Sequence, residues 1–495
     1  MFVSQLVLKS FTLFVFLILP SASVVVAQQQ EDDVENATLM TSDDSNDSSL
    51  LLPGELLDDN VAVYTLGDAG YENATSVQYM LPTWLKYQPP AVVYADTPEE
   101  ISSIVRWALE ETIDATATSA TKEENDGSNE ASLGLISPVG GGHSSAGYSM
   151  TGNAVAIRAG PNLSKVGPLN TQTETLVVGA GAICTDIANY LNGTGYVTAT
   201  GVCPDVGISG WTLGGGYSPF SKFLGLGSDN VVSFDIVLPN GTYVENVHEH
   251  NHDDLFWAVR GAGHQSFGHV TSWTIRVLPL PSFLIHTVPD LPCEMDPEFC
   301  ANVLNQWQRH NFYNKTWVDS KLATYSFHMS RNLSKGIDAP ITVTFTFVYA
   351  DSSTNANEIL DAILQPFHEY IENNIPSGSK FKKQSYVETK NMYPLFHLDD
   401  EGYGSVSMDP NTNTYEAKVG LYLKKEMTLE DWRVLVDTSL GVRKLLTDGA
   451  TGMYFVFEVY SNAITDKPSD DNAHYQRAQV LGTVTVFVRI TQQHL

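Results

Sequence analysis

Runs of apolar residues separated by polar turns predict a series of short strands along the first part of the chain. The first run covers 91–94, and Thr97 and Glu100 behind it have the spacing of a capping box that opens a helix. A polar, low-complexity stretch at 112–131 predicts a solvated insertion loop. Further strands are predicted at 135–136, 153–158, 175–178, 231–238 and 271–278, and further helices at 185–191 and 254–260.

The pattern changes at Pro279 and Pro281, which predict a boundary between a domain at 61–281 and a second domain at 282–495. The second part mixes longer helical patterns with strands, an order that predicts an α+β fold with an antiparallel sheet backed by helices on one face. The strands are predicted at 323–327, 341–349, 415–422, 453–459 and 483–490, and the helices at 301–311, 357–373 and 429–446.

The composition is that of a globular protein with two domains. The chain has 495 residues, of which 43% are hydrophobic and 10% aromatic, and this length exceeds that of a single simple core. Its 57 acidic residues against 27 Lys and Arg give a formal net charge of −30. So large a negative charge favours solubility and argues against nucleic acid as a partner.

The N-terminal 27 residues have the organisation of a cleavable signal peptide, with Lys9, a short apolar run and small residues before Gln28. The alternative is an uncleaved membrane anchor, but Pro20 shortens the apolar run, and no other stretch has the length of a membrane span. Residues 28–60 are acidic and predict a disordered segment. We therefore expect a secreted, extracellular protein without stable membrane association. Sequons for glycosylation support this at Asn36, Asn46, Asn73, Asn162, Asn192, Asn240, Asn314 and Asn332.

Four cysteines leave two disulfide pairings open in an oxidising compartment. Cys293 and Cys300 are separated by six residues and are expected to close a small loop. The alternative joins Cys184 to Cys203. We favour the first pairing, because Cys203 lies in a loop rich in glycine.

Two glycine-rich loops, 138–147 and 201–216, each hold one reactive side chain, His143 in the first and Cys203 in the second. Glycine lets a backbone approach a ligand closely, and its N–H groups can line a pyrophosphate. The spacing fits neither a dinucleotide fingerprint nor a P-loop, and no further ligand has the spacing of a zinc site. The hypothesis is that His143 and Cys203 hold the same cofactor; taken singly, a structural or surface histidine and a disulfide cysteine are the alternatives.

The motifs around these loops resemble those of the berberine-bridge-enzyme-like flavoproteins of the vanillyl-alcohol-oxidase superfamily. The resemblance runs from Gly67 to Gln479 and is carried, in order, by residues 90–101, 140–144, 201–230, 254–261, 266–268 and 472–477. It implies a PCMH-type FAD-binding domain of two subdomains and a substrate domain. Members of the family continue for several dozen residues past the last of these motifs, so we expect a chain ending at Leu495 to lack that tail.

The same resemblance implies FAD attached by two covalent bonds, from His143 to the 8α-methyl carbon of the flavin and from Cys203 to its C6. A thiolate is the reacting form of a cysteine. Where the family often has arginine, this chain has Val139 and Lys222. The other residues expected to contact the cofactor are Gly140, Gly141, Gly142, Ser144, Gly147, Val206, Gly207, Gly210, Gly214, Gly215, Gly216, Gly225, Asp229 and Asn230.

Family chemistry is the removal of a hydride from a carbon that carries a hydroxyl or amine, helped by a general base. Glu458 and Tyr460 alternate on one face of a predicted strand and are the candidate catalytic residues; Glu388 and His474 are weaker candidates. Val206 has the position that admits oxygen in the family, which predicts an oxidase that produces hydrogen peroxide. We expect a monomer acting on a small alcohol, an oligosaccharide or an alkaloid-like molecule. The alternative is a secreted flavin scaffold without turnover that serves in binding or defence.

Overall fold

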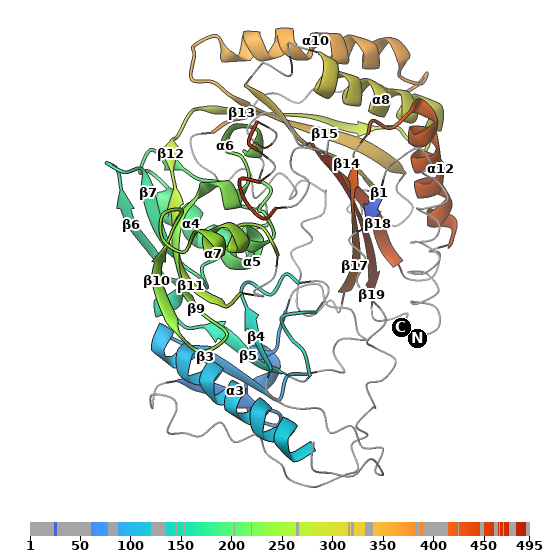
Figure 1. Cartoon of the computed structure of the whole chain (residues 1–495). Helices are drawn as coiled ribbons and strands as arrows, with labels where there is room; N and C mark the ends of the chain where they lie inside the picture. Colours follow the sequence, from blue (N-terminus) through green and yellow to red (C-terminus); the bar gives the residue numbers. More distant parts are fainter. Residues whose placement is uncertain are drawn as a thin grey trace.

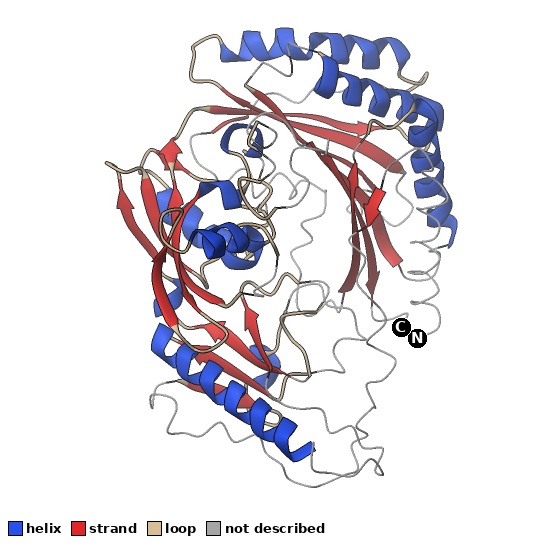
Figure 2. Cartoon of the chain, viewed as in Figure 1, coloured by secondary structure: helices blue, strands red, loops and turns tan. Residues whose placement is uncertain are grey.

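The computed structural model describes residues 24–26, 61–77, 88–119, 135–389, 414–459, 464–474 and 482–491, with gaps of up to eight residues inside these ranges. Four sheets organise the chain into two lobes, and the helices lie on the outer faces of the sheets or between the lobes (Figures 1 and 2). In the described part of the chain, no helix has both the length and the apolar character required to cross a membrane.

A four-stranded sheet forms one end of the first lobe, and its strand order is β2 (Ala62–Thr65), β3 (Ala91–Ala95), β5 (Ala154–Ala159), β4 (Leu135–Val139). The strand pairs β3–β5 and β4–β5 are parallel, whereas β2 is antiparallel to β3. Helix α3 (Pro98–Ser119) lies along this sheet in Figure 1.

The predicted capping box at the start of α3 is confirmed. Thr97 Oγ1 accepts a hydrogen bond from the Glu100 N–H at 3.2 Å, and Glu100 Oε2 accepts one from the Thr97 N–H at 3.1 Å. The predicted loop at 112–131 is wrong in its first part, because α3 continues to Ser119. The helical part, 112–119, contains two Ala and no Gly or Pro, so nothing in it stops the helix that begins at Pro98, and low complexity alone does not interrupt a helix.

A second, antiparallel sheet completes the first lobe, in the order β10 (Tyr243–Val247), β9 (Val231–Val237), β11 (His269–Arg276), β7 (Thr175–Gly179), β6 (Val166–Asn170). Phe234 and Trp273 of this sheet are buried together with side chains of three helices that lie beside it in Figure 1. These helices are α4 (Cys184–Leu191), α5 (Ile208–Leu213) and α7 (Asp253–Val259). The shorter elements of the lobe are α2 (Tyr71–Ala74), β8 (Tyr196–Val197), α6 (Ser221–Leu224) and β12 (Leu278–Pro279), with 3-10 turns at 162–164 and 227–230.

The second lobe is an eight-stranded antiparallel sheet with helices α8 (Pro297–Tyr313), α10 (Ala356–Asn374) and α12 (Leu429–Leu445) on one face (Figure 1). The predicted α+β architecture is therefore confirmed. Three strands of this sheet were not predicted: β1 (Val24–Val26), β13 (Phe283–Leu291) and β16 (Val387–Thr389). Prolines punctuate β13, and β16 is short. Strand β1 lies inside the segment 1–27 predicted to be a cleaved signal peptide, so the mature protein is expected to keep the other seven strands. The strand order is β1 (Val24–Val26), β17 (Thr414–Leu423), β19 (Gly482–Thr491), β18 (Ala450–Val459), β14 (Leu322–Arg331), β15 (Ile341–Ala350), β13 (Phe283–Leu291), β16 (Val387–Thr389).

One disulfide joins Cys293 to Cys300, at the entry to α8, and confirms the favoured pairing. Cys184 and Cys203 are not disulfide-bonded. The thiol of Cys203 is therefore not consumed by a cross-link, and this is a condition for its predicted bond to a cofactor.

A shared apolar cluster and a lysine join the two lobes. Phe220 of the first lobe and Phe283 of the second are buried with their ring centroids 4.6 Å apart. Beside them, Lys222 of α6 donates hydrogen bonds to the backbone carbonyl oxygens of Trp317 at 2.8 Å and Leu322 at 2.5 Å. Lys222, which stands where the family commonly has arginine, thus fastens α6 to the second lobe.

His269 makes the stability of the first lobe sensitive to acid. Burial lowers the pKa of this histidine to about 4, and its Nδ1 has no hydrogen-bond partner among the described residues. In the unfolded chain the pKa of a histidine is about 6.5. Below that pH the unfolded state binds a proton that the folded state does not bind, so acid favours unfolding. Between pH 7 and pH 5 we expect a loss of about 2 kcal/mol in unfolding free energy.

The measurement is urea unfolding at both pH values for the wild type and for His269→Phe, which replaces the imidazole with an apolar ring. The other histidines are common to both proteins, so the difference between their pH slopes isolates His269. Equal slopes would contradict the assignment.

Candidate cofactor site

The first glycine-rich loop begins where β4 ends at Val139. Gly140, Gly141, Gly142, His143 and Ser144 follow directly, and the carbonyl oxygen of Ser144 accepts a hydrogen bond from the Gly147 N–H at 2.9 Å. The loop is thus a short turn at the carboxyl end of a parallel strand, a common position for a ligand in such sheets. His143 is mostly shielded from solvent, with 17% of its side chain exposed.

The second loop is anchored to the turn that opens α4. The Cys184 N–H donates to the carbonyl oxygen of Val206 at 3.0 Å, and the Ile208 N–H donates to that of Ala182 at 2.9 Å. Gly207 is the N-terminal cap of α5, Gly210 lies within that helix, and Gly214 is its C-terminal cap. Cys203, half-buried, therefore lies on a loop that both helices hold in place.

The two loops meet backbone to backbone. A Cβ atom built on Gly141 would lie 2.3 Å from the carbonyl oxygen of Asp205 and 2.4 Å from the nitrogen of Gly207. One built on Gly207 would lie 2.2 Å from the nitrogen of Gly141. Only glycine permits this approach, because the atoms in contact are backbone atoms that cannot turn aside. The structure thus brings together the loops that carry His143 and Cys203.

A side-chain contact also joins the loops: His143 Nε2 lies 3.0 Å from Asp205 Oδ1. Burial acts to raise the pKa of the Asp205 carboxyl, but the hydrogen bond and charge of His143 outweigh it and hold that pKa below its usual value. Asp205 was missed by the sequence analysis, because an acidic residue between a cysteine and a glycine has no distinctive signal.

The two thiols of this region differ in their environment. Burial raises the pKa of the Cys184 thiol to about 12. A backbone hydrogen bond from Gly201 acts to lower this pKa, and the charges of Cys203 and Asp205 act to raise it further. Cys184 is therefore protonated and inert at neutral pH. Cys203, the more exposed of the two, is the cysteine suited to react.

The remaining predicted cofactor contacts line one stretch after α5. Gly215 and Gly216 both have positive φ angles, and Gly225 caps α6. Asp229 and Asn230 are buried and have partners within the protein: Asp229 Oδ2 accepts from the Leu226 N–H at 2.8 Å, and the amide of Asn230 donates to the carbonyl oxygens of Leu224 and Leu226 at 2.9 and 2.8 Å. These bonds brace the loop, and direct contact with the cofactor stays a prediction.

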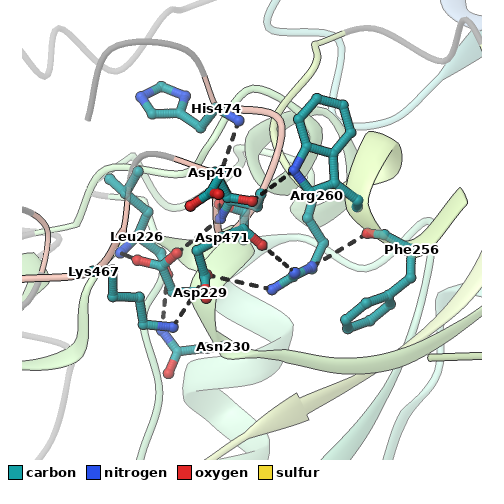
Figure 3. Close-up of polar contacts among 12 residues, drawn as sticks. Leu226, Asp229, Asn230, Phe256, Arg260, Lys467, Asp470, Asp471 and His474 are labelled. Carbon is teal, nitrogen blue, oxygen red and sulfur yellow. Dashed lines mark hydrogen bonds and ion pairs between the residues drawn. The ribbon is translucent and has the colours of Figure 1, made fainter. Parts of the chain in front are cut away.

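A late segment of the chain, 470–474, returns to the first lobe and fastens to this stretch (Figure 3). Asn472 donates to Asp229 Oδ1 at 2.8 Å, and the Trp257 indole donates to the carbonyl oxygen of Asp470 at 2.9 Å. Arg260 donates to the carbonyl oxygen of Asp471 at 2.6 Å while its guanidinium lies over the Phe256 ring at 4.1 Å. We refer to residues 470–474 as the clasp.

The clasp also places His474, one of the weaker catalytic candidates. This histidine is buried, and a Cβ atom on Gly215 would lie 2.5 Å from its Nδ1. Its imidazole therefore lies against Gly215, which is predicted to run beside the flavin. The backbone N–H of His474 donates to Asn472 Oδ1 at 3.1 Å, so the residue that binds Asp229 also holds the backbone of His474 in place.

The stronger catalytic candidates are less fully located. Glu458 lies in β18, opposite Thr483 of β19, in the interior of the large sheet. Glu388 lies in β16 at the edge of that sheet, opposite Leu284. Tyr460 lies outside the described residues. The described residues contain no group of three or more His, Cys, Asp or Glu side chains suited to a metal ion.

Comparison with known proteins agrees with this geometry. Residues 129–246 match a family described as an FAD binding domain. An FAD-linked oxidoreductase of Pestalotiopsis fici is 34% identical over 195 residues, which cover 39% of this chain and 36% of that protein. Reticuline oxidase of Papaver somniferum is 33% identical over 173 residues, or 34% of this chain and 31% of the enzyme. The matched part thus spans about a third of the length of these relatives.

Solved structures share the fold over most of the chain. A variant of berberine bridge enzyme in complex with (S)-reticuline superposes with a TM-score of 0.65, at 20% identity over 88% of this chain and 78% of that one. Carbohydrate oxidase from Microdochium nivale gives a TM-score of 0.65, at 21% identity over 87% and 81% of the two chains.

The chain is therefore of the class of proteins in which an FAD-binding domain is joined to a second lobe built on an antiparallel sheet. Within that class, the comparisons confirm the predicted resemblance to the berberine-bridge-enzyme-like flavoproteins. The residues present fit FAD: two glycine-rich loops, whose N–H groups can line a pyrophosphate, meet backbone to backbone, and they carry an imidazole and a thiol outside any disulfide.

Proposed function

We propose that this chain is a secreted FAD-dependent oxidoreductase that carries its flavin on His143 and Cys203. The observation that carries the proposal is the backbone contact between Gly141 and Gly207, which brings the loops of these two residues together. The match to an FAD binding domain covers both loops. Secretion is supported by the predicted signal peptide, by the sequons and by the Cys293–Cys300 disulfide.

The flavin, when bound, would accept the hydride from the substrate and would later pass two electrons to dioxygen. The residues of the chain supply the rest. The glycine loops hold the cofactor in place, and a base removes the proton of the substrate hydroxyl. We propose Glu458 or Tyr460 for this base, and His474 is a further candidate because it lies beside Gly215. Val206 next to Gly207 is the residue proposed to admit oxygen.

A small alcohol or an oligosaccharide is the proposed substrate. Proteins of the same fold include the carbohydrate oxidase already described and a xylooligosaccharide oxidase from Myceliophthora thermophila, solved in complex with xylobiose. Berberine bridge enzyme, solved with (S)-reticuline, shows that the fold also accepts an alkaloid. The expected reaction is oxidation of a hydroxyl-bearing carbon with release of hydrogen peroxide.

The test begins with the mature protein purified from a secreting host. Acid-precipitated protein is expected to stay yellow, and peptide masses are expected to show FAD on the peptides of both His143 and Cys203. Anaerobic addition of sugars or alcohols should then bleach the flavin, and air should restore the colour with one hydrogen peroxide per turnover. A colourless protein with an unmodified Cys203 would reject the proposal; a yellow protein that no substrate bleaches would favour the scaffold without turnover.

A further inference from the structure

The contact between His143 and Asp205 assigns a role to a residue that the proposed function does not use. Nε2 of His143 lies 3.0 Å from Asp205 Oδ1, the distance of an ion-pair contact. The two residues come from different loops, and Asp205 is two positions from Cys203. The carboxylate thus contacts one of the two side chains that are proposed to bond to the flavin and lies on the same loop as the other.

The position of Asp205 is fixed twice. Its backbone carbonyl oxygen packs against Gly141, and its side chain meets His143 two residues further along the same loop. A chance encounter of two surface side chains would leave Asp205 mobile, whereas here the backbone contact sets the register in which the side chains meet. Although 41% of the Asp205 side chain is exposed, its pKa is held below the usual value, so it is ionised at neutral pH.

A carboxylate on one imidazole nitrogen decides which tautomer the ring adopts. Asp205 accepts hydrogen bonds and cannot donate one, so the proton of a neutral His143 stays on Nε2. The lone pair is then on Nδ1, which makes that nitrogen the nucleophile. The same carboxylate stabilises the positive charge that the ring acquires as Nδ1 forms a bond, as a buried aspartate does for a catalytic histidine.

We propose that Asp205 is a positioning residue for flavin attachment: it orients His143 and takes the Nε2 proton as Nδ1 bonds to the 8α-methyl carbon. The bond replaces one hydrogen of the imidazole and one of the methyl group. These leave as two protons and two electrons; one proton passes to Asp205, and dioxygen takes the electrons and is reduced to hydrogen peroxide. This inference rests on the proposed covalent link between His143 and FAD.

The experiment uses full-length protein produced under riboflavin limitation and then mixed with FAD in air. The fraction of His143 peptide and of Cys203 peptide that carries flavin is followed over time by mass spectrometry. In Asp205→Asn we expect His143 attachment to slow about tenfold or more, equivalent to about 1.4 kcal/mol in the barrier. Attachment to Cys203 should proceed with little change, and Asp205→Glu should recover part of the His143 rate because it restores the carboxylate.

The control is Asp437→Asn, which removes an exposed carboxylate on α12 in the other lobe and should match the wild type at both sites. A purely structural role for Asp205 would lower attachment at His143 and Cys203 together, and that result would overturn the inference. Equal rates at His143 in the wild type and Asp205→Asn would overturn it as well. Wild-type protein that binds no flavin at all would instead reject the proposed function.

Discussion

Alanine at Gly141 or Gly207 is expected to abolish flavin binding, because either methyl group drives the two loops apart. A Cβ on Gly141 would sit 2.3 Å from the carbonyl oxygen of Asp205, and one on Gly207 would sit 2.2 Å from the nitrogen of Gly141. Relief requires movement of the backbone that positions His143 and Cys203. We expect less than about one tenth of the wild-type content of covalently held flavin, since a shift of about 1 Å can cost about a hundredfold in the rate of a reaction between positioned groups, here the proposed attachment.

Gly210 and Gly140, which are also predicted to contact the cofactor, separate packing between the loops from contact with the cofactor, because a Cβ on either one meets no close protein atom. A Cβ on Gly210 meets nothing within 4 Å, and it lies inside α5, where alanine is a better helix former than glycine. Gly210→Ala should therefore fold at least as well as the wild type. A Cβ on Gly140 makes only an ordinary contact at 3.8 Å with the Cα of Gly207.

The measurement is the ratio of flavin to protein absorbance together with the melting temperature. Loss of flavin in a folded Gly140→Ala variant would show that Gly140 contacts the cofactor itself. Normal flavin content in both Gly141→Ala and Gly207→Ala would contradict the packing argument.

The sequence predicted most of the helices and strands because each carries a local signal. The capping box at Thr97 and the long amphipathic pattern of α10 are examples, and both agree with the structure. What the sequence could not predict is set by tertiary contact. Strand β13 contains Pro289 and follows Pro281, so its local pattern is that of a linker. It nevertheless pairs with β15 from Phe283 to Val288 and again at Leu291, with an irregularity at the proline.

The site shows the same division. His143 and Cys203 were found because their glycine-rich surroundings are unusual in a sequence. Asp205, Lys222 and the clasp owe their importance to partners that lie up to 244 residues away along the chain, as in the bonds from Asn472 to Ser228 and Asp229. No local pattern encodes a partner so far away along the chain, and a single sequence contains no other information about which distant residues meet.

Asp229→Ala is expected to release the clasp and to lower the unfolding free energy by about 3 kcal/mol or more. Asp229 is buried, and its two carboxylate oxygens accept hydrogen bonds from the Leu226 N–H and from Asn472, each at 2.8 Å. A hydrogen bond to a charged group contributes about 1.5–3 kcal/mol, and alanine leaves both donors without this acceptor. Because the same residue holds the turn before it and the clasp, one substitution should loosen both.

Hydrogen exchange locates the effect. The amides of Ala473 and His474 are bonded to the carbonyl oxygen of Trp257 and to Asn472 Oδ1, so both should lose protection in Asp229→Ala. Asn472→Ala should expose the same amides at a smaller cost in stability, because the Leu226 bond survives.

Lys467→Ala is the control, since its ion pair with Asp471 at 3.5 Å joins side chains that are about one third exposed and contributes less than about 1 kcal/mol. If Asp229→Ala unfolds within about 0.5 kcal/mol of the Lys467 variant, the clasp is not held by Asp229. If it instead behaves as expected and the flavin content falls with the protection of His474, the late segment and the cofactor site form one cooperative unit.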